Sequence, residues 1–538
     1  MIKGIKCLSQ SLIADRKIEY EIEITNVLGN CYDEENVSLE MVLRNFENSP
    51  KTFYGFCYKD DKWRFRLCFY EGGEYNGDII LYLKGKEIDR HSIKFYVEEN
   101  QNRKGVLGVE PVNKKHFCFK NGDVFTAVGE NLAWGPKGDN ATFFEEVCEK
   151  LKVSGANWTR LWLTTEWYLS MFNKDGVPGD FSTSLEAAEL LDKILDIFEK
   201  NGIYVQLVLF NHTNVNSRRG GEHDRNWHDF SFNSATENGY LDTPSEFFTD
   251  DRAKKDVKKY IRYLVSRYGY SSNILCWELF NEVNMAEGNA DDIYEWHKAM
   301  SEYIRSIDQQ GHMVSTSSST PVYALIYDDM FDFINQHRYG DIANVYHIIS
   351  DVTWISLCYK KPVLLSECGS SWTGNYVDRT IIHQHLWAGL MCNSAGTGMH
   401  WFWENINKLP DNDGYKDLKI VSDFAKKIPW NEKGHSFITA ANLDIDSNKI
   451  NALGYKNNNY YFVWFYDSEF TFTTRKVSVV ENVNINLILE NGIYEYYWLD
   501  CWSGEEVERN IVEIKDGKIK ITMPLWKRDI TFVICRKD

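Results

Sequence analysis

The chain of 538 residues lacks an excess of positive charge and lacks any long apolar run. It carries 60 Lys and Arg against 78 Asp and Glu, which gives a formal net charge of −18. Proteins that bind nucleic acid or anionic membrane surfaces need basic patches, so we expect neither partner. No segment reaches about 18 consecutive apolar residues, so the sequence predicts no membrane span.

Signal-peptide and metal-binding patterns are also lacking. The N-terminus, MIKGIKCLSQSLIAD, has no apolar core of about 7–15 residues, which a secretory signal needs. The 12 Cys form no CxxC pair and no zinc-type spacing. Cys276 and Cys535 lie inside apolar runs, as buried free thiols do. We therefore expect a reducing, cytoplasmic location; a secreted form whose signal has been removed would have the same N-terminus and stays an alternative.

Both ends of the chain have the two-residue period of β-strands. In Ile18–Ile24 apolar and charged residues alternate, as they do in strands with one buried face. Near the other end, Asp516 and Gly517 separate two alternating runs, a pattern typical of a β-hairpin. Residues 1–104 and 430–538 are therefore each predicted to form a β-sandwich.

Residues 105–429 differ, because short apolar runs alternate there with amphipathic helical patterns. Eight strand–helix units over about 320 residues predict a (β/α)8 TIM barrel with insertions, and so an α/β fold flanked by two sandwiches. A doubly wound sheet is the alternative, but it needs a Gly-rich turn after its first strand, and Gly129-Glu130-Asn131 is not one. The predicted strands cover residues 125–132, 156–163, 203–210, 274–280, 312–316, 331–337, 362–366 and 398–403.

Two glutamates directly follow predicted strands four and seven. The run 274–280 ends in Asn281-Glu282, and the run 362–366 ends in Glu367. The carboxyl ends of barrel strands meet on one face, where active sites lie. Cleavage of a glycosidic bond needs two carboxyl groups, one protonated and one ionised. Two such glutamates therefore indicate a glycosidase, although each alone is equally typical of a rim or helix-capping residue.

The sequences WELFNEV (277–283) and LLSECG (364–369) resemble the clan of (β/α)8 retaining glycosidases, and glycoside hydrolase family 5 is the most similar family within it. The resemblance covers most of residues 105–430. It implies that Glu282 is the acid/base and Glu367 the nucleophile of a double displacement. It also implies carboxyl groups roughly 5–5.5 Å apart, with no cofactor and no metal.

Further residues match the family one by one. The resemblance implies that Arg160 supports the nucleophile and that Asn281 binds the sugar 2-hydroxyl. His337 and Tyr339 match a His-x-Tyr motif, so Tyr339 is expected to donate a hydrogen bond to Glu367. The structural alternative is a salt bridge closing the barrel for Arg160 and a tyrosine capping a core for Tyr339.

Other candidates are expected to line the sugar site. His212 is expected to contact the sugar, and Trp403 to form a platform for it at the end of strand eight. Trp134 is expected to form a subsite wall, and Glu404 to bind sugar hydroxyls. The alternative is core packing for the tryptophans and a structural role for His212. Glu278 is expected to support its neighbours rather than to react. The long segment 211–249, with Arg218, Arg219, Gly220, Gly221, Trp227 and His228, is expected to form a rim around the site.

The expected substrate is a β-linked oligosaccharide or polysaccharide, with gluco- or manno-configuration favoured by the WELFNE run. A β-galactosidase, β-xylosidase or arabinosidase of the same clan stays an alternative, as does a non-catalytic carbohydrate-binding barrel. A metal-dependent hydrolase would need a His-x-His motif on strand one, which instead reads TAVGENLAW. Either sandwich could bind carbohydrate or only pack on the barrel, and the oligomeric state is left open.

Overall fold

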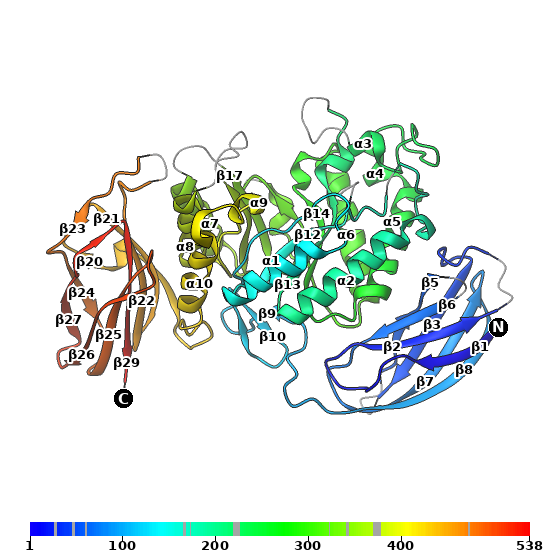
Figure 1. Ribbon diagram of the computed structural model, residues 1–538, viewed down its shortest axis with the longest axis horizontal. Helices are drawn as coiled ribbons and strands as arrows, with labels where there is room; N and C mark the ends of the chain where they lie inside the picture. Colours follow the sequence, from blue (N-terminus) through cyan, green and yellow to red (C-terminus); the bar gives the residue numbers. More distant parts are fainter. Residues whose placement is uncertain are drawn as a thin grey trace.

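A computed structural model of the protein has three parts in a row (Figure 1): an N-terminal sandwich, a central α/β barrel and a C-terminal sandwich. None of the helices in the described part of the chain is both long and apolar enough to cross a membrane. The structure describes residues 1–538 except 26–28, 46–48, 60–61, 165–167, 173, 219–225, 322, 340–343, 370–377, 472–473 and 538.

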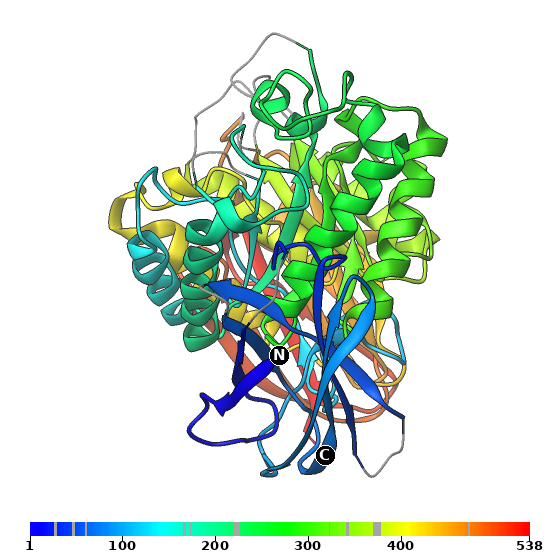
Figure 2. The same cartoon turned by 90° about the vertical axis from the view of Figure 1, so that its right-hand side faces the viewer.

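The N-terminal sandwich consists of two antiparallel sheets with strand orders β1-β2-β6-β5 and β4-β3-β7-β8. Apolar residues on alternate positions face inward, and Ile18, Ile22 and Phe65 are completely buried between the sheets. Figure 2 places this part at the lower end of the molecule. Its strands are β1 (Ile2–Cys7), β2 (Ile18–Ile24), β3 (Val37–Arg44), β4 (Lys51–Tyr54), β5 (Phe56–Lys59), β6 (Lys62–Leu67), β7 (Gly73–Leu83) and β8 (Lys86–Val97).

The cysteines only partly match the expectation of free thiols. Cys276 and Cys535 are free, but Cys31 and Cys57 form a disulfide in the N-terminal sandwich, with Cα atoms 5.8 Å apart. No sequence pattern indicates this pair, because the two residues are 26 positions apart and meet only when the sandwich folds. Disulfides persist mainly in oxidising compartments, so the cytoplasmic location stays a prediction.

A small antiparallel sheet closes the bottom of the barrel. Phe117, Phe119 and Phe125 of this sheet pack against Trp158 and Leu364, which point into the barrel from its strands. Figure 1 shows β9 and β10 below the barrel strands. The sheet consists of β9 (Leu107–Val109), β10 (Phe117–Phe119) and β11 (Val124–Phe125).

The parallel strands of the barrel form two hydrogen-bonded groups, β12-β13-β14-β15 and β16-β17-β18. Strand five is interrupted at Thr316: its first half pairs with β14 and its second half with β17, so the two groups are continuous. The strands are β12 (Trp158–Trp162), β13 (Tyr204–Asn211), β14 (Ile274–Asn281), β15 (Met313–Ser315), β16 (Ser317–Ser318), β17 (Ile334–Tyr339) and β18 (Val363–Gly369).

Strands one and eight are not the regular strands that the sequence predicts at 125–132 and 398–403. Residue 125 belongs to the bottom sheet, and the rest of both segments forms only single bridges such as Gly129 to Trp158. The physical reason is close backbone approach: a Cβ on Gly129 would lie 1.7 Å from the Trp158 carbonyl oxygen. Backbone hydrogen bonds still join the segments, as in Thr397 N to Ala127 O at 2.8 Å.

Helices cover the barrel, as the 3.6-residue pattern predicts. In α2, Leu191, Ile194, Leu195 and Phe198 are buried, and the helix ends at Gly202 with φ 69°, a left-handed cap that glycine adopts without strain. The helices are α1 (Thr142–Val153), α2 (Leu185–Asn201), α3 (Asn226–Asp229), α4 (Glu246–Thr249), α5 (Asp251–Tyr268), α6 (Ala290–Ile307), α7 (Asn344–Cys358), α8 (Arg379–Met391), α9 (Trp403–Ile406) and α10 (Asp413–Ala425).

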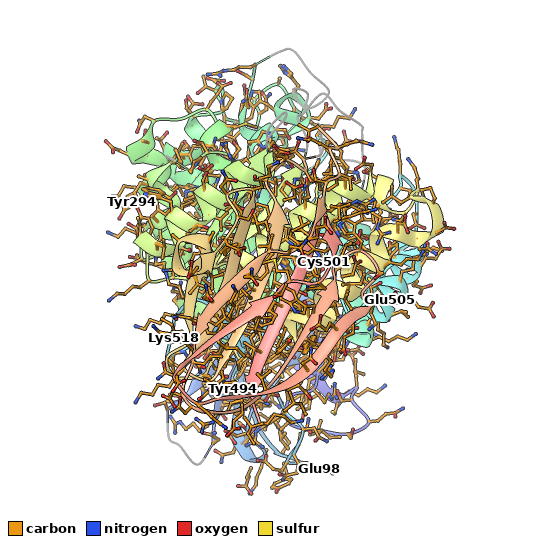
Figure 3. All side chains as sticks on the ribbon, turned by 90° about the vertical axis from the view of Figure 1, so that its left-hand side faces the viewer. Glu98, Tyr294, Tyr494, Cys501, Glu505 and Lys518 are labelled. Carbon is orange, nitrogen blue, oxygen red and sulfur yellow. A yellow bond between two sulfur atoms is a disulfide. The ribbon has the colours of Figure 1, made fainter. Side chains whose placement is uncertain are left out.

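The C-terminal sandwich places a six-stranded sheet, β19-β21-β22-β29-β25-β26, against the barrel. Tyr455, Phe462 and Trp464 on one face belong to the barrel's apolar core, and the other face encloses a separate core. Figure 3 views this sandwich from the front, with Tyr494 and Lys518 labelled. Its strands are β19 (Ser436–Thr439), β20 (Asp444–Ile445), β21 (Ile450–Asn457), β22 (Tyr460–Asp467), β23 (Val479–Val480), β24 (Asn484–Ile488), β25 (Gly492–Asp500), β26 (Glu506–Ile514), β27 (Lys518–Thr522), β28 (Trp526–Lys527) and β29 (Asp529–Arg536).

Candidate active site

Two glutamates lie side by side at the carboxyl ends of β14 and β18. Glu282 is 7% and Glu367 3% exposed. The ring of His337 lies between them, with Nδ1 2.9 Å from Glu282 Oε1 and 3.3 Å from Glu367 Oε2. One carboxylate oxygen of each glutamate and one nitrogen of His337 all lie within 4.8 Å of one another. The residues are 85 positions apart by number and meet only because their strands end on the same face of the barrel.

The backbone of Glu282 is left-handed, with φ 49° and ψ 48°. A residue with a Cβ costs roughly 1–2 kcal/mol in this region, and such strain is concentrated at functional sites. The hydroxyl oxygen of Ser317 accepts a hydrogen bond from the Glu282 backbone N–H at 3.0 Å and so helps to hold the turn. The turn directs the Glu282 side chain away from the strand path and toward Glu367.

Two donors hold the Glu367 carboxylate, one on each oxygen. The buried Arg160 of β12 donates a short hydrogen bond from Nη1 to Oε1. The Tyr339 hydroxyl donates to Oε2 at 2.6 Å, which is the hydrogen bond that the His-x-Tyr motif predicts. Both donors stabilise the ionised form of Glu367.

The surroundings separate the proton affinities of the two glutamates. Burial raises the pKa of Glu282 well above its ordinary value, and the neighbouring charge of Glu367 raises it further. Burial also raises the pKa of Glu367, but Arg160 and Tyr339 oppose that rise. Burial, together with Arg160, keeps the pKa of His337 well below its ordinary value, so this ring is neutral. The site therefore offers a protonated acid beside an ionised carboxylate.

Asn281 and His212 extend the group on the side of β13 and β14. The amide nitrogen of Asn281 lies 3.4 Å from His212 Nδ1. The same His212 Nδ1 lies 3.7 Å from Glu282 Oε2. The Asn281 side-chain oxygen accepts a hydrogen bond from Arg160 at 2.7 Å. The structure thus brings all seven polar residues that were predicted from strands two to seven into one contiguous group: Arg160, His212, Asn281, Glu282, His337, Tyr339 and Glu367.

Trp403 does not occupy the predicted position. It begins helix α9 rather than ending strand eight, and it is only 1% exposed, with its ring packed edge-on against Trp134 and Trp401. The expected platform role for Trp403 is therefore wrong. Trp401, which the sequence reasoning missed, is partly exposed, and its backbone N–H donates to the Cys368 carbonyl beside Glu367 at 2.9 Å. Both tryptophans lie in the run WFW, and nothing in that run indicates which of the two stays exposed near the carboxylates.

The remaining predicted residues lie at the edge of this group. Trp134 is partly buried in edge-on contact with Trp162 and Trp401, at centroid distances of 5.6 Å. Glu404 is exposed in the first turn of α9, and no contact among the described residues joins it to Glu282 or Glu367.

The predicted rim segment 211–249 is only partly described. It includes α3 and α4, and Trp227 is buried at 3% exposure. Arg219, Gly220 and Gly221 lie outside the described residues. The role of the segment as a rim stays a prediction.

Within the described residues, Glu282, His337 and Glu367 are also placed where they could hold a cation. A metal bound there would need His337 Nδ1 as a ligand, because Nδ1 is the ring nitrogen that contacts both carboxylates. A ligating ring nitrogen carries no proton. The Ser366 hydroxyl donates to Asn335 and so accepts from His337 Nε2 at 3.1 Å, which leaves Nδ1 of the neutral ring as the acceptor for the proton of Glu282. Because that hydrogen bond occupies Nδ1, the group fits a hydrogen-bonded acid pair better than a metal centre.

The fold and the carboxylate pair define the class: a (β/α)8 barrel with two buried acids at strands four and seven. A family model described as Cellulase (glycosyl hydrolase family 5) matches residues 118–408, which is more than half of the chain. The chain therefore belongs to glycosyl hydrolase family 5.

Curated relatives include mannan endo-1,4-beta-mannosidases from fungi. The F enzyme of Aspergillus clavatus is 27% identical over 275 residues, which cover 45% of this chain and 60% of that protein. The A enzyme of Podospora anserina is 31% identical over 134 residues, which cover 25% of this chain and 32% of that protein. The chain thus spans less than two thirds of the length of these two relatives.

Solved structures share the fold. A protein of Bacteroides vulgatus, described as a candidate glycoside hydrolase, aligns with 98% of this chain and 100% of its own, with a TM-score of 0.69 and 16% identity. A glycoside hydrolase family 5 protein of the same species aligns with 81% of this chain and 95% of its own, with a TM-score of 0.54 and 14% identity. The first of these likenesses extends the shared architecture to both sandwiches.

Proposed function

We propose that the protein is a retaining β-glycoside hydrolase that acts on a β-linked, manno-configured oligosaccharide or polysaccharide. The observation that carries the proposal is the pair Glu282 and Glu367, whose nearest carboxylate oxygens lie within 4.8 Å. This spacing suits retaining enzymes, which need roughly 5–5.5 Å, rather than inverting enzymes, which need roughly 6.5–9.5 Å to admit a water.

The mechanism is a double displacement. In the first step Glu367 attacks the anomeric carbon while Glu282 gives its proton to the departing glycosidic oxygen, so an ester bond forms as the glycosidic bond breaks. In the second step the now ionised Glu282 takes a proton from water, and the hydroxide attacks the same carbon. The ester breaks, the sugar leaves with retained configuration, and Glu367 is ionised again.

The neighbours of the pair support these two steps. Arg160 and Tyr339 keep Glu367 ionised for attack, and Tyr339 becomes free to contact the ring oxygen side of the sugar once the ester forms. Asn281 and His212 present polar groups beside Glu282, where sugar hydroxyls would bind. Trp134 and Trp401 offer aromatic surface next to them, which suits the apolar faces of pyranose rings.

The manno-configuration is supported by the names of the curated relatives, which act on mannan. The test is hydrolysis of β-1,4-mannohexaose, cellohexaose and xylohexaose, together with aryl β-galactoside and arabinoside. We expect the highest kcat/KM on the mannoside. A clear preference for another sugar would keep the hydrolase assignment and overturn the manno-configuration.

The catalytic pair is tested by substitution and by trapping. Glu367→Gln and Glu282→Gln should each lower kcat by at least about 10³-fold on natural substrates, and Glu145→Gln, on the exposed surface of α1, should not. A 2-deoxy-2-fluoro-mannoside should add one sugar mass to Glu367 in wild type but none in Glu367→Gln. Tight sugar binding without turnover would instead favour the non-catalytic barrel.

A further inference from the structure

A third glutamate, Glu278, lies in the same buried group on β14. It is 0% exposed and four residues before Glu282. Its carboxylate forms a two-point salt bridge with Arg160, with Oε2 3.0 Å from Nε and Oε1 2.7 Å from Nη2. A buried carboxylate at this place needs an explanation, because its desolvation is costly unless it is fully paired.

The contacts of Arg160 show what the salt bridge does. A guanidinium has five N–H donors in a fixed plane, and five hydrogen bonds leave this one. Two go to Glu278, one from Nη2 to Asn281 at 2.7 Å, one from Nη1 to Asn131 at 3.4 Å and one from Nη1 to Glu367. Because the Glu278 bridge uses the Nε edge, it turns the Nη1 group toward Glu367.

Glu278 also accepts a hydrogen bond from Gln206 of the neighbouring strand β13. Gln206 Nε2 donates to Glu278 Oε2 at 3.2 Å, and Gln206 Oε1 accepts from Trp158 Nε1 at 2.7 Å. The chain of contacts therefore runs from the barrel core through Glu278 and Arg160 to Glu367. Each member is buried, so none can rotate without leaving an unpaired polar group.

The charges in the group lead to a second consequence. Three carboxylates share one buried cation, Arg160, because His337 is neutral. Beside the effect of burial, the charges of Glu367 and Glu278 raise the pKa of Glu282, and Arg160 opposes them. Among the residues that the structure describes, the ionisable groups facing Glu282 are Arg160 of β12, His212 after β13, Glu278 of β14, His337 and Tyr339 of β17, and Glu367 of β18.

We propose that Glu278 is a positioning residue for the proposed glycosidase reaction: its carboxylate fixes Arg160 against Glu367 and Asn281. Glu278 acts through its neighbours and does not touch the sugar. The inference rests on the proposed function, but the charge effect on Glu282 is measurable without turnover.

The variant Glu278→Gln removes the charge and keeps the size. We expect kcat/KM to fall about 10²-fold, since misplacing a reacting group by about 1 Å costs this much. We also expect the alkaline limb of the pH profile, which reports loss of the Glu282 proton, to move to lower pH by roughly one unit. An unchanged kcat/KM with unchanged limbs would overturn the proposal.

The variant Glu278→Asp separates charge from position. It keeps the negative charge but shortens the side chain, so kcat should fall while both limbs stay near the wild-type values. If Glu278→Gln does not fold, as judged by circular dichroism, Glu278→Asp still tests the positioning role. A wild-type kcat in Glu278→Asp would refute that role. Glu130→Gln is the matched control, because Glu130 is 1% exposed on strand one and faces Tyr415 rather than Arg160; its pH limbs should match wild type.

A titration distinguishes this proposal from the proposed function. The pKa of Glu282 can be followed by NMR of carboxyl-labelled glutamate and assigned with Glu282→Gln. A drop of about one unit in Glu278→Gln supports the charge effect even if no tested sugar is cleaved. An unchanged titration of Glu282 would overturn it even in an active enzyme.

Discussion

The two sandwiches contact the barrel in different ways. Tyr455, Phe462 and Trp464 of the C-terminal sandwich belong to the same apolar core as Trp387 and Phe424 of the barrel. The N-terminal sandwich has an apolar core of its own between its sheets. Its buried Phe56 joins the barrel core beside Tyr263, but several ion pairs also cross this interface.

Asp192 of α2 is the centre of the N-terminal interface. It accepts hydrogen bonds from Arg66 of β6 at 2.6 and 3.1 Å and from Arg267 of α5 at 3.2 and 2.6 Å. A second contact joins Lys259 of α5 to Asp33 at 2.9 Å. Desolvation offsets most of the attraction in such pairs, so they fix the orientation of the sandwich more than they stabilise its docking.

The C-terminal interface also contains charges, but they are enclosed by aromatic rings. His383 of α8 lies 2.8 Å from Asp529 of β29 and 3.3 Å from Asp417 of α10. The indole nitrogens of Trp464 and Trp502 donate to the same Asp529 at 3.2 and 2.7 Å. From this comparison we expect the barrel and the C-terminal sandwich to fold as one unit and the N-terminal sandwich to be separable.

Truncation should break the comparison most strongly. Removal of residues 430–538 exposes the shared core, so the remaining chain should be insoluble or lack a cooperative unfolding transition. Removal of residues 1–104 uncovers the ring of Tyr263 under Phe56 but otherwise mainly charged groups, so the remaining chain should stay soluble and folded. Soluble yield and circular dichroism measure both. Equal behaviour of the two truncations would contradict the comparison.

Trp464→Ala should have the next largest effect. Removing this 1% exposed ring should lower the free energy of unfolding of the barrel by about 3–5 kcal/mol. Trp63→Ala, at a 4% exposed position inside the N-terminal sandwich, should lower only the transition of that sandwich. Differential scanning calorimetry separates the two, and a barrel transition that shifts equally in both variants would argue against two units.

His383 should make the C-terminal interface sensitive to alkaline pH. Asp529 and Asp417 raise the pKa of His383 to about 9, against the desolvation that lowers it. The folded-state pKa lies above the ordinary value, so this stabilisation is complete below about pH 6.5 and is lost as the pH rises through about 9. We expect it to reach about 3 kcal/mol. The stability difference between wild type and His383→Gln, measured by urea unfolding, should shrink over this window; a constant difference would refute the prediction.

Asp192→Asn should have the smallest effect. The Asp192 side chain is 18% exposed, so water partly replaces the lost ion pairs and the cost should be about 1–2 kcal/mol. The loss should appear in the N-terminal transition and become smaller at high salt, whereas the Trp464→Ala loss should not depend on salt. Calorimetry at 0.05 and 1 M salt, as rough limits, provides the measurement.

Much of the candidate site could be predicted because its residues follow strongly apolar strands. Glu282 and Glu367 are easy to place once the runs before them are identified as strands of one barrel. Of the five hydrogen bonds of Arg160, the resemblance implied only the one to Glu367. The two to Glu278 could not be predicted, since Arg160 and Glu278 are 118 positions apart and lie on strands that β13 separates. The sequence suggested a neighbour-supporting role for Glu278 but not its partner.

The fold was predicted well where periodicity is strong and poorly where the backbone makes close contacts. Strands one and eight depend on Gly129 and Gly396, which have no side chain and so leave no apolar alternation to detect. Trp403 was misplaced for a related reason, because strand eight ends before it and α9 begins there. The Cys31–Cys57 pair depends on tertiary proximity alone.

The left-handed backbone of Glu282 has a practical consequence. Glycine adopts φ 49° without a steric cost, so Glu282→Gly would remove the proton donor and relax the turn that carries it. With an aryl glycoside, whose leaving group departs without protonation, such a variant would load Glu367 and then lack the base for release. The long-lived ester could then be crystallised with its sugar in place.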